Sequence, residues 1–239
     1  MDKEKIIAKI TSRYPGKEII IDPPGAVDPA EIIVELEPTS QHPGHSLALA
    51  VVGKSTPHYH KKTTEIYEAV EGIVKIDIEG KEVVLQPGEK VTINPKQLHH
   101  AEGNKAWFLT HSRPGWTFED HIVWDSIVDA IEKSWSAQSS FLPNEWSNDN
   151  PARGQCAVTA LIVQDELGGE IVKCDVFGDK DSHFFNKLSG GQIIDLTKRQ
   201  FDNHAALKHK RVADREKILS HPGTQERYER LRAAVELSL

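Results

Sequence analysis

Two histidines and one glutamate in the first half of the chain are spaced like the ligands of a metal ion. His58 and His60 lie two residues apart, so on a β-strand both side chains point to the same side. Glu65 follows after a short turn, and His99 returns after further strand-like runs. Three imidazoles and one carboxylate suit a first-row transition metal such as zinc, iron, manganese, nickel or copper. The chain has 12 histidines, so a chance pair without a ligand role is the alternative.

The residues around this set have the pattern of a small all-β domain. Tight turns are indicated at Gly72, Gly80, Pro87-Gly88 and Pro95. Between them, apolar and charged side chains alternate, as in strands with one buried face. We expect strands at residues 18–21, 31–37, 46–52, 65–70, 73–78, 82–85, 90–93 and 107–110. Short strands at regular spacing predict a β-sandwich or a barrel.

Residues 57–99 resemble the cupin family. The first cupin motif, HxH followed by a glutamate and a glycine, is matched by His58, His60, Glu65 and Gly72. The second motif, a PG turn followed by P-x-x-x-H, is matched by Pro87, Gly88, Pro95 and His99. Two departures concern loop geometry rather than the ligands: Gly53 precedes HxH at a shifted distance, and Lys96 stands where a glycine often follows the second proline.

The cupin resemblance implies a fold, a cofactor and a type of ligand. It implies that residues 1–120 form an all-β double-stranded β-helix that holds one divalent transition metal (zinc, iron, manganese or nickel), with Tyr67 lining the pocket. The implied function is a metal-dependent enzyme acting on a small oxygen-rich molecule, such as a sugar or a keto acid. A non-catalytic module that binds or senses a metal or a small molecule fits the same ligands. Cupins often pair through their outer strands, so a homodimer is expected.

The pattern changes after Trp116. Residues 122–135 carry apolar side chains with a period of 3.6 residues, which predicts a helix. A linker rich in Ser, Asn, Asp and Pro follows, and residues 154–165 predict a second helix that Gly168-Gly169 ends. Strand-like runs then occupy residues 170–177, 183–188 and 192–196. We therefore expect a two-domain chain, with an α+β domain at residues 121–239.

One cysteine in this second half has the surroundings of a nucleophile. Cys156 begins a predicted helix, where the helix dipole favours a thiolate. His183 and Asp195 follow on separate predicted strands, the order of parts in transglutaminase-like and papain-related enzymes. In that interpretation Gln155 helps to stabilise an oxyanion, and the domain is a thiol hydrolase or acyltransferase. The alternative is a structural cysteine in an apolar core helix, because free cysteine is among the most buried residue types.

The second half also resembles the YunG-like family of bacterial proteins. The likeness rests on Trp146 with Asn150-Pro151, and then on the runs GQCAVTAL, HFFN, DLT and QF. It covers about residues 124–237 and implies a type of domain without implying a reaction.

Composition limits the partners. With 239 residues and a hydrophobic fraction of 38%, the chain can form one or two domains. A net charge of -7 argues against a general nucleic-acid binder, so a small-molecule ligand is expected. The basic run 208–217 predicts the solvated face of a helix. A C-terminal helix at 225–239 is expected to pack through Tyr228, Leu231, Ala234 and Leu237.

The termini and the cysteines bear on location. No apolar run approaches the roughly 20 residues of a membrane span, and the charged start MDKEKIIAKI lacks the apolar core of a secretory signal. A disulfide framework is not expected from two cysteines, Cys156 and Cys174, although one bridge between them stays open. These features fit a reducing cytoplasm and a protein without a membrane partner. The apolar stripe Ile6, Ile7 and Ile10 predicts a short amphipathic helix at residues 3–13 that serves as a lid or a dimer contact.

Overall fold

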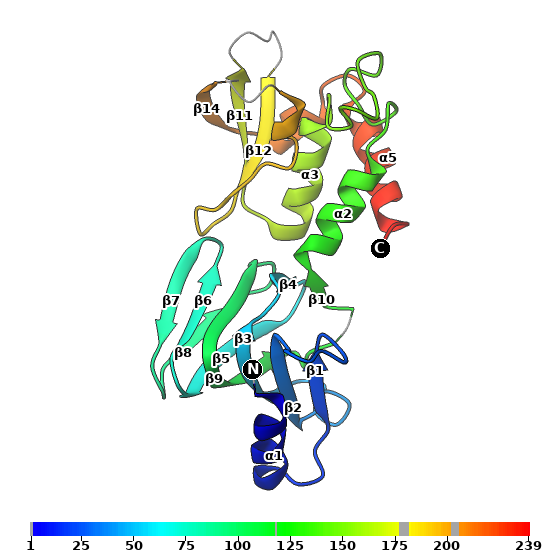
Figure 1. The fold of residues 1–239 in the computed structure, drawn as a ribbon. Coiled ribbons are helices and arrows are strands. Elements are labelled where there is room, and N and C mark those ends of the chain that lie inside the picture. Colours follow the sequence, from blue (N-terminus) through cyan, green and yellow to red (C-terminus); the bar gives the residue numbers. More distant parts are fainter. Residues whose placement is uncertain (1, 118, 177–181, 202–205) are drawn as a thin grey trace. The chain divides into compact units, whose positions relative to one another are not determined.

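The chain divides into two compact units, Met1–Trp124 and Asp125–Leu239. The computed structural model describes residues 2–117, 119–176, 182–201 and 206–239 (Figure 1). Within the described residues, no helix is long and apolar enough to cross a membrane.

The first unit is β-rich and barrel-like, with a single ten-stranded sheet preceded by one helix. The helix is α1 (Lys3–Arg13). The strands are β1 (Ile19–Asp22), β2 (Glu31–Glu37), β3 (Ser46–Lys54), β4 (His58–His60), β5 (Thr64–Glu71), β6 (Val74–Ile78), β7 (Lys81–Leu85), β8 (Lys90–Ile93), β9 (His99–Arg113) and β10 (His121–Val123). All the strands predicted for residues 18–110 are present, and this part of the fold prediction is confirmed.

The long strand β9 connects the sheet. Its second half pairs with both β3 and β5, while its first residues pair with β6 and, at His99, with β4. All these pairings are antiparallel. The register sets His58 opposite His99 and Glu65 opposite Ser112. Strand β9 therefore pairs with strands from several separate parts of the sequence, including the strands that carry His58 and Glu65.

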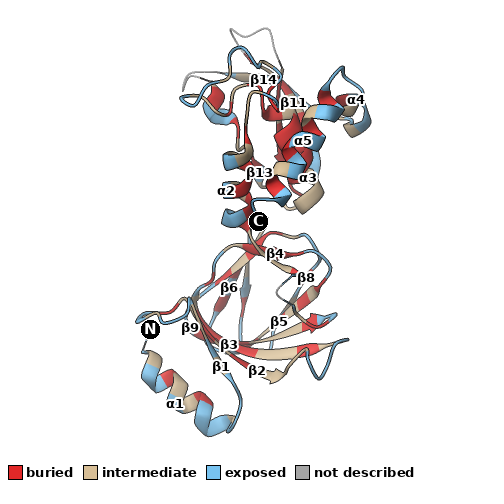
Figure 2. Ribbon diagram, turned by 90° about the vertical axis from the view of Figure 1, so that its right-hand side faces the viewer, coloured by how far each residue is buried: buried red, intermediate tan, exposed pale blue. Residues whose placement is uncertain are grey.

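Strand β3 is buried on both faces, which explains its uninterrupted apolar sequence LALAVV. Ala50 and Val52 face the barrel core with Tyr67 and Phe108. The alternate residues of β3 pack with Ile10 of α1 on the opposite face of the sheet. Helix α1 therefore uses its apolar stripe within its own unit, through Ile6 and Ile10, and the prediction of a lid or a dimer contact is wrong for these residues (Figure 2).

The second unit contains both helices and strands. Its helices are α2 (Trp124–Ser134), α3 (Cys156–Leu167), α4 (Arg215–Leu219) and α5 (Thr224–Glu236), with a short 3-10 helix at Lys198–Gln200. Strands β11 (Glu170–Val176), β12 (Ser182–Lys187), β13 (Ile193–Ile194) and β14 (Leu207–Ala213) form an antiparallel sheet in the order β13-β12-β11-β14. Helix α3 is buried along most of its length and contacts β11, β12 and α5 (Figure 2). Gly168, in the left-handed region at φ 72°, ends α3 as predicted.

Three expectations for the second half need correction. Ile122 and Val123 belong to strand β10, which pairs with β4, so the helix predicted from residue 122 begins at Trp124. The helix predicted at residues 208–217 is wrong for most of this run: 207–213 form strand β14, which pairs with β11, and Asp214 then caps the short α4, which begins at Arg215. Helix α5 packs through Tyr228, Leu231 and Val235, while Leu237 is 90% exposed. Phe177, the last residue of the strand predicted at 170–177, lies outside the described residues.

Candidate functional site

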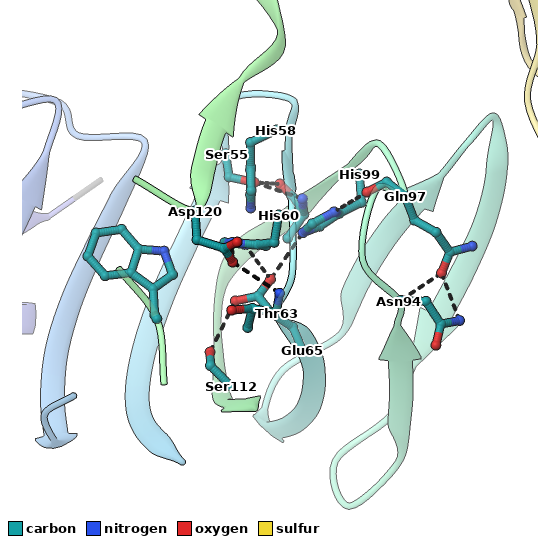
Figure 3. A network of polar contacts seen from close by, with 12 residues as sticks. Ser55, His58, His60, Thr63, Glu65, Asn94, Gln97, His99, Ser112 and Asp120 are labelled. Carbon is teal, nitrogen blue, oxygen red and sulfur yellow. Dashed lines mark hydrogen bonds and ion pairs between the residues drawn. The ribbon is translucent and has the colours of Figure 1, made fainter. Parts of the chain in front are cut away.

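The four side chains predicted as metal ligands converge in the first unit. Donor atoms of His58, His60, Glu65 and His99 all lie within 4.8 Å of one another, and the four residues are buried. Strand β4 supplies the first two and the start of β5 and of β9 supplies the others, so the side chains turn toward a common point (Figure 3). His100, the neighbour of His99, pairs with Asp77 and is not part of this group.

Backbone contacts orient two of the imidazole rings. The Nδ1 atom of His58 lies 2.8 Å from the carbonyl oxygen of Thr56, and the Nδ1 atom of His99 lies 2.9 Å from that of Gln97. A carbonyl oxygen only accepts, so each Nδ1 carries the proton and each Nε2 presents a lone pair. A protonated Nδ1 bound to a carbonyl is the usual support of a histidine that ligates a metal through Nε2.

His60 has the least satisfied side chain of the group. Its Nε2 lies 3.1 Å from Oε2 of Glu65 and its Nδ1 lies 3.6 Å from Oδ2 of Asp120. Neither ring nitrogen makes a hydrogen bond to the described residues, although the side chain is only 2% exposed. A buried polar atom without a hydrogen bond is costly, and a cation coordinated by Nε2 would remove that cost.

Charge states within the group also fit a cation. Burial by itself would raise the pKa of Glu65, but His60 and His99 lower that pKa well below its ordinary value. Burial lowers the pKa of His58 well below its ordinary value, and the neighbouring His99 and His121 lower it further. A charged carboxylate and a neutral imidazole are the forms in which Glu65 and His58 bind a metal. Burial would lower the pKa of His60, but Glu65 and Asp120 raise it, so a metal bound by Nε2 would displace a proton from this ring. The donor set, three nitrogens and one carboxylate oxygen, is compatible with a transition metal.

Tyr67, predicted to line the pocket, is buried beside the group. Its ring centroid lies 5.9 Å from that of His99 and 4.7 Å from that of Phe108. Burial raises the pKa of Tyr67 well above its ordinary value, and the charges of Glu65 and Glu31 raise it further. The phenol therefore keeps its proton at neutral pH.

Three residues beside this group were missed by the sequence analysis. Asp120 accepts hydrogen bonds from the backbone N–H groups of Lys62 and Thr63, at 2.7 and 3.0 Å, and faces His60. His121 pairs with His60 across β10 and β4, and its ring centroid lies 4.4 Å from that of His58. Burial, with the charges of Asp22 and Glu65, raises the pKa of a third residue, Glu31, to about 8.

These three positions lie outside both cupin-like motifs. The signal that could have found Asp120 and His121 is the short apolar run at 121–123, which extends the sheet beside the HxH strand. Glu31 stands at the start of a correctly predicted strand, but its neighbours Asp22 and Val52 come from pairing partners that the sequence pattern does not specify.

The second unit brings together the predicted Cys156, His183 and Asp195. The Nε2 atom of His183 lies 2.8 Å from Oδ2 of Asp195, and the Cys156 thiol donates to the carbonyl oxygen of Ser182, the residue before His183, at 3.9 Å. Both cysteines of the chain are free thiols, so no bridge joins them. The oxyanion role expected for Gln155 is not supported, because its side chain is fully buried and donates to the carbonyl oxygen of Ser136 at 2.8 Å.

Comparison with known proteins agrees with the two-part pattern of the sequence. A cupin domain model matches residues 45–106, and a model described as YunG protein matches residues 124–239. The YunG protein of Bacillus subtilis (strain 168) is 36% identical over 104 residues, which are 44% of this chain and 84% of that protein. The chain belongs to the YunG family. In this member of the YunG family, the matched region follows a cupin domain.

Solved structures similar to the chain include cupin-like proteins. KdgF from Halomonas sp. is 20% identical, with 38% of this chain and 86% of that chain covered and a TM-score of 0.34. Pac13, described as a nucleoside dehydratase, is 12% identical, with 44% and 82% covered and a TM-score of 0.38. Ectoine synthase from P. lautus is 19% identical, with 38% and 70% covered and a TM-score of 0.33.

Proposed function

We propose that the barrel of the first unit is a metal-dependent enzyme site for a small oxygen-rich molecule, such as a sugar or a keto acid. The observation that carries the proposal is the buried convergence of His58, His60, Glu65 and His99, with Nε2 of His60 lacking any hydrogen bond among the described residues. These four residues would hold one divalent transition metal. When bound, such an ion polarises a carbonyl or hydroxyl oxygen of the substrate.

The chain's own residues supply the proton chemistry in this proposal. Burial raises the pKa of Glu31 to about 8, so this carboxyl carries a proton at neutral pH and can give it to or take it from a substrate. Tyr67 keeps its phenolic proton, because burial and the charge of Glu65 raise its pKa. Asp120 faces Nδ1 of His60 and would fix the ring with Nε2 directed at the other ligands.

Metal content tests the ligand set directly. Elemental analysis of the purified full chain is expected to give about one transition-metal ion per chain, and His58→Ala and His60→Ala are expected to fall well below that value. His99→Ala and His100→Ala form a matched pair, because the residues are adjacent but only His99 belongs to the ligand group. Retained metal in His100→Ala and lost metal in His99→Ala support the proposal. A wild-type chain that neither contains nor takes up a transition metal contradicts it.

Turnover separates an enzyme from a binding or sensing module. Proton exchange in deuterium oxide, followed by NMR over a panel of aldoses, ketoses and keto acids, detects abstraction of a proton next to a carbonyl. We expect exchange to require the metal, and Glu31→Gln to lose it while it keeps the metal. If compounds of the panel bind and none exchanges or changes, the proposed enzyme is wrong and a binding module is the better interpretation.

A further inference from the structure

The second unit contains a cavity of about 480 Å³ that the metal-centre proposal does not use. Cys156 borders it, together with aromatic side chains that include Phe141, Phe184 and Phe201. The volume is in the range of small-molecule sites. The described residues of its lining contain five lysines and arginines and one carboxylate; they are Arg153, Lys173, Arg211, Lys217 and Arg227, and Asp214. An anionic compound therefore fits this cavity better than a cationic one.

Cys156 combines access to the cavity with a basic partner. It is the first residue of α3 and is 9% exposed. Its thiol donates to the carbonyl oxygen of Ser182 at 3.9 Å and lies close enough to the adjacent His183 to help raise the pKa of that ring. Cys174 is fully buried among Val172 and Phe185 and does not line the cavity. Burial raises the pKa of Cys174, which keeps it a neutral thiol. The two cysteines thus differ in the features that make a thiol reactive.

Hydrogen bonds hold the His183 ring in the orientation of a general base. Nε2 lies 2.8 Å from Oδ2 of Asp195, so the carboxylate accepts a hydrogen bond from the Nε2–H group. On the other side of the ring, Nε2 of Gln200 lies 3.3 Å from Nδ1 of His183. The amide donates to this nitrogen, so Nδ1 is the acceptor of the ring, and it is the nitrogen that can receive a proton. Gln200 is itself fixed, because its Oε1 accepts from the backbone N–H of Gly154.

Arg227 lines the same cavity and has an unused hydrogen-bond donor. Its Nε and Nη2 donate to the carbonyl oxygen of Gly223 and to Oγ1 of Thr224, whereas its buried Nη1 has no hydrogen-bond partner among the described residues. The guanidinium lies 5.4 Å from the ring centroid of Phe141, and Arg227 and Cys156 both line the cavity. A buried guanidinium N–H without a partner is costly, and a ligand carboxylate would satisfy it.

We propose that the second unit is a thiol hydrolase for esters, thioesters or amides whose acyl group bears a carboxylate. Cys156 is the nucleophile, His183 is the general base and acid, Asp195 is a positioning residue, and Arg227 binds the substrate carboxylate. This site shares no residue with the metal centre, so it stands or falls independently of the metal-dependent activity.

The reaction balances with water as the only co-reactant. The proton of the Cys156 thiol first passes to Nδ1 of His183, where it replaces the hydrogen bond from Gln200 and leaves the ring charged. Sγ then attacks the acyl carbon as a thiolate, and the carbonyl π pair moves to oxygen. The pair returns, the bond to the leaving group breaks, and His183 gives its proton to that group. Water then attacks the thioester as His183 takes one of its protons, and the acid is released as the C–S bond breaks. The sulfur regains a proton from His183.

Two alkylating agents test together whether Cys156 is a reactive nucleophile and whether its cavity prefers an anionic compound. Iodoacetamide and iodoacetate transfer groups of similar size to a thiol, but only iodoacetate carries a carboxylate. In the full-length Cys174→Ala protein, Cys156 should react faster with iodoacetate than with iodoacetamide. Arg227→Gln should slow the reaction with iodoacetate roughly fivefold to tenfold. It should change the rate of the reaction with iodoacetamide by no more than about twofold.

A matched control lies on the same helix. Arg230 pairs with Glu226 on α5, is exposed, and does not line the cavity. Arg230→Gln removes the same charge and should leave both alkylation rates unchanged. The proposal is overturned if Cys156 reacts no faster than Cys174 does in Cys156→Ala, or if Arg230→Gln and Arg227→Gln have equal effects.

Two chromogenic esters test turnover. The protein should hydrolyse p-nitrophenyl hydrogen succinate in preference to p-nitrophenyl acetate, with a succinyl adduct on Cys156 in the intact mass spectrum. Cys156→Ala should abolish both signals, and His183→Asn should lower the rate by about 10²- to 10⁴-fold. His60→Ala should retain the esterase, which separates this site from the metal centre. A wild-type protein that forms no adduct and cleaves neither ester refutes the hydrolase even if His183→Asn does not fold.

Discussion

The Nδ1 atom of His60 lies 3.6 Å from the Oδ2 atom of Asp120. Asp120 is in turn fixed by the backbone N–H groups of Lys62 and Thr63 (Figure 3). These hydrogen bonds tie the Asp120 carboxylate to the loop that follows the HxH strand. Asp120 lies next to the ring nitrogen of His60 that faces away from the other ligands. A residue that orients a metal-binding histidine takes this position.

Asp120→Asn should weaken metal binding without removing the site. The amide cannot carry the negative charge that holds Nδ1 of His60 protonated, so metal affinity should fall about 10- to 100-fold while the stoichiometry stays at about one per chain. Competition with a chromophoric chelator measures the affinity. Asp129→Asn, at an exposed position paired with Lys133, is the control and should leave affinity unchanged. Equal affinities in the two variants would exclude the orienting role.

His121 should be dispensable for metal stoichiometry. Its ring is 4.4 Å from that of His58, centroid to centroid, but its nitrogens are not part of the donor group within 4.8 Å. Burial, then the charge of His60, lowers the pKa of His121 to about 4, so the ring is neutral at neutral pH. His121→Gln should therefore keep about one metal per chain in elemental analysis, whereas His58→Ala should not. Loss of metal in His121→Gln would make it a fifth ligand.

The metal ligands could be predicted because they are close in sequence and follow strand periodicity. His58 and His60 lie on one strand, and Glu65 begins the next, so two short motifs contain most of the site. Asp120 and His121 come from a segment whose only link to this site is its pairing with β4. The short apolar run at 121–123 indicates a strand, but no local pattern specifies that this strand pairs with β4.

The same physical limit explains the errors in the second half. The run 207–213 has the charged composition of a surface helix, but pairing with β11 sets its conformation. Arg227 is one of several arginines on α5, and only the folded arrangement shows that its Nη1 lacks a partner. By contrast, Cys156, His183 and Asp195 were identified from the order of their elements, since a helix start and two adjacent strands leave few ways to arrange them.

Thr159→Val should destabilise the second unit through a single lost acceptor. Nε1 of Trp135 donates to Oγ1 of Thr159 at 2.9 Å, and both residues are buried. The substitution keeps the side-chain shape but leaves the indole N–H without a partner, which costs about 1–3 kcal/mol in the free energy of unfolding. Urea denaturation followed by tryptophan fluorescence measures the loss. Adding Trp135→Phe removes the stranded donor, so a double-mutant cycle should show coupling; additive losses would contradict the argument.

Stability of the second unit should fall as pH rises toward 9. Burial would lower the pKa of His183, but its hydrogen bond to Asp195 and its contact with Cys156 raise that pKa from 6.5 to about 9. The charged ring therefore stabilises the folded state fully below pH 6.5, and this contribution, roughly 3 kcal/mol at most, is lost as pH rises through about 9. Burial raises the pKa of Cys174, which lies opposite His183 on β11.

Thermal unfolding between pH 6.5 and pH 9.5, roughly the window set by the two pKa values, measures this change. In Asp195→Asn the hydrogen bond to a charged partner is absent, so the melting temperature should be lower at pH 6.5 and should change less across the window. Asp175→Asn is the control, because this carboxylate pairs with His209 and Arg211 at an exposed site of the same sheet. If Asp195→Asn shows the same fall in melting temperature as the wild type, the ionised His183 does not stabilise the fold.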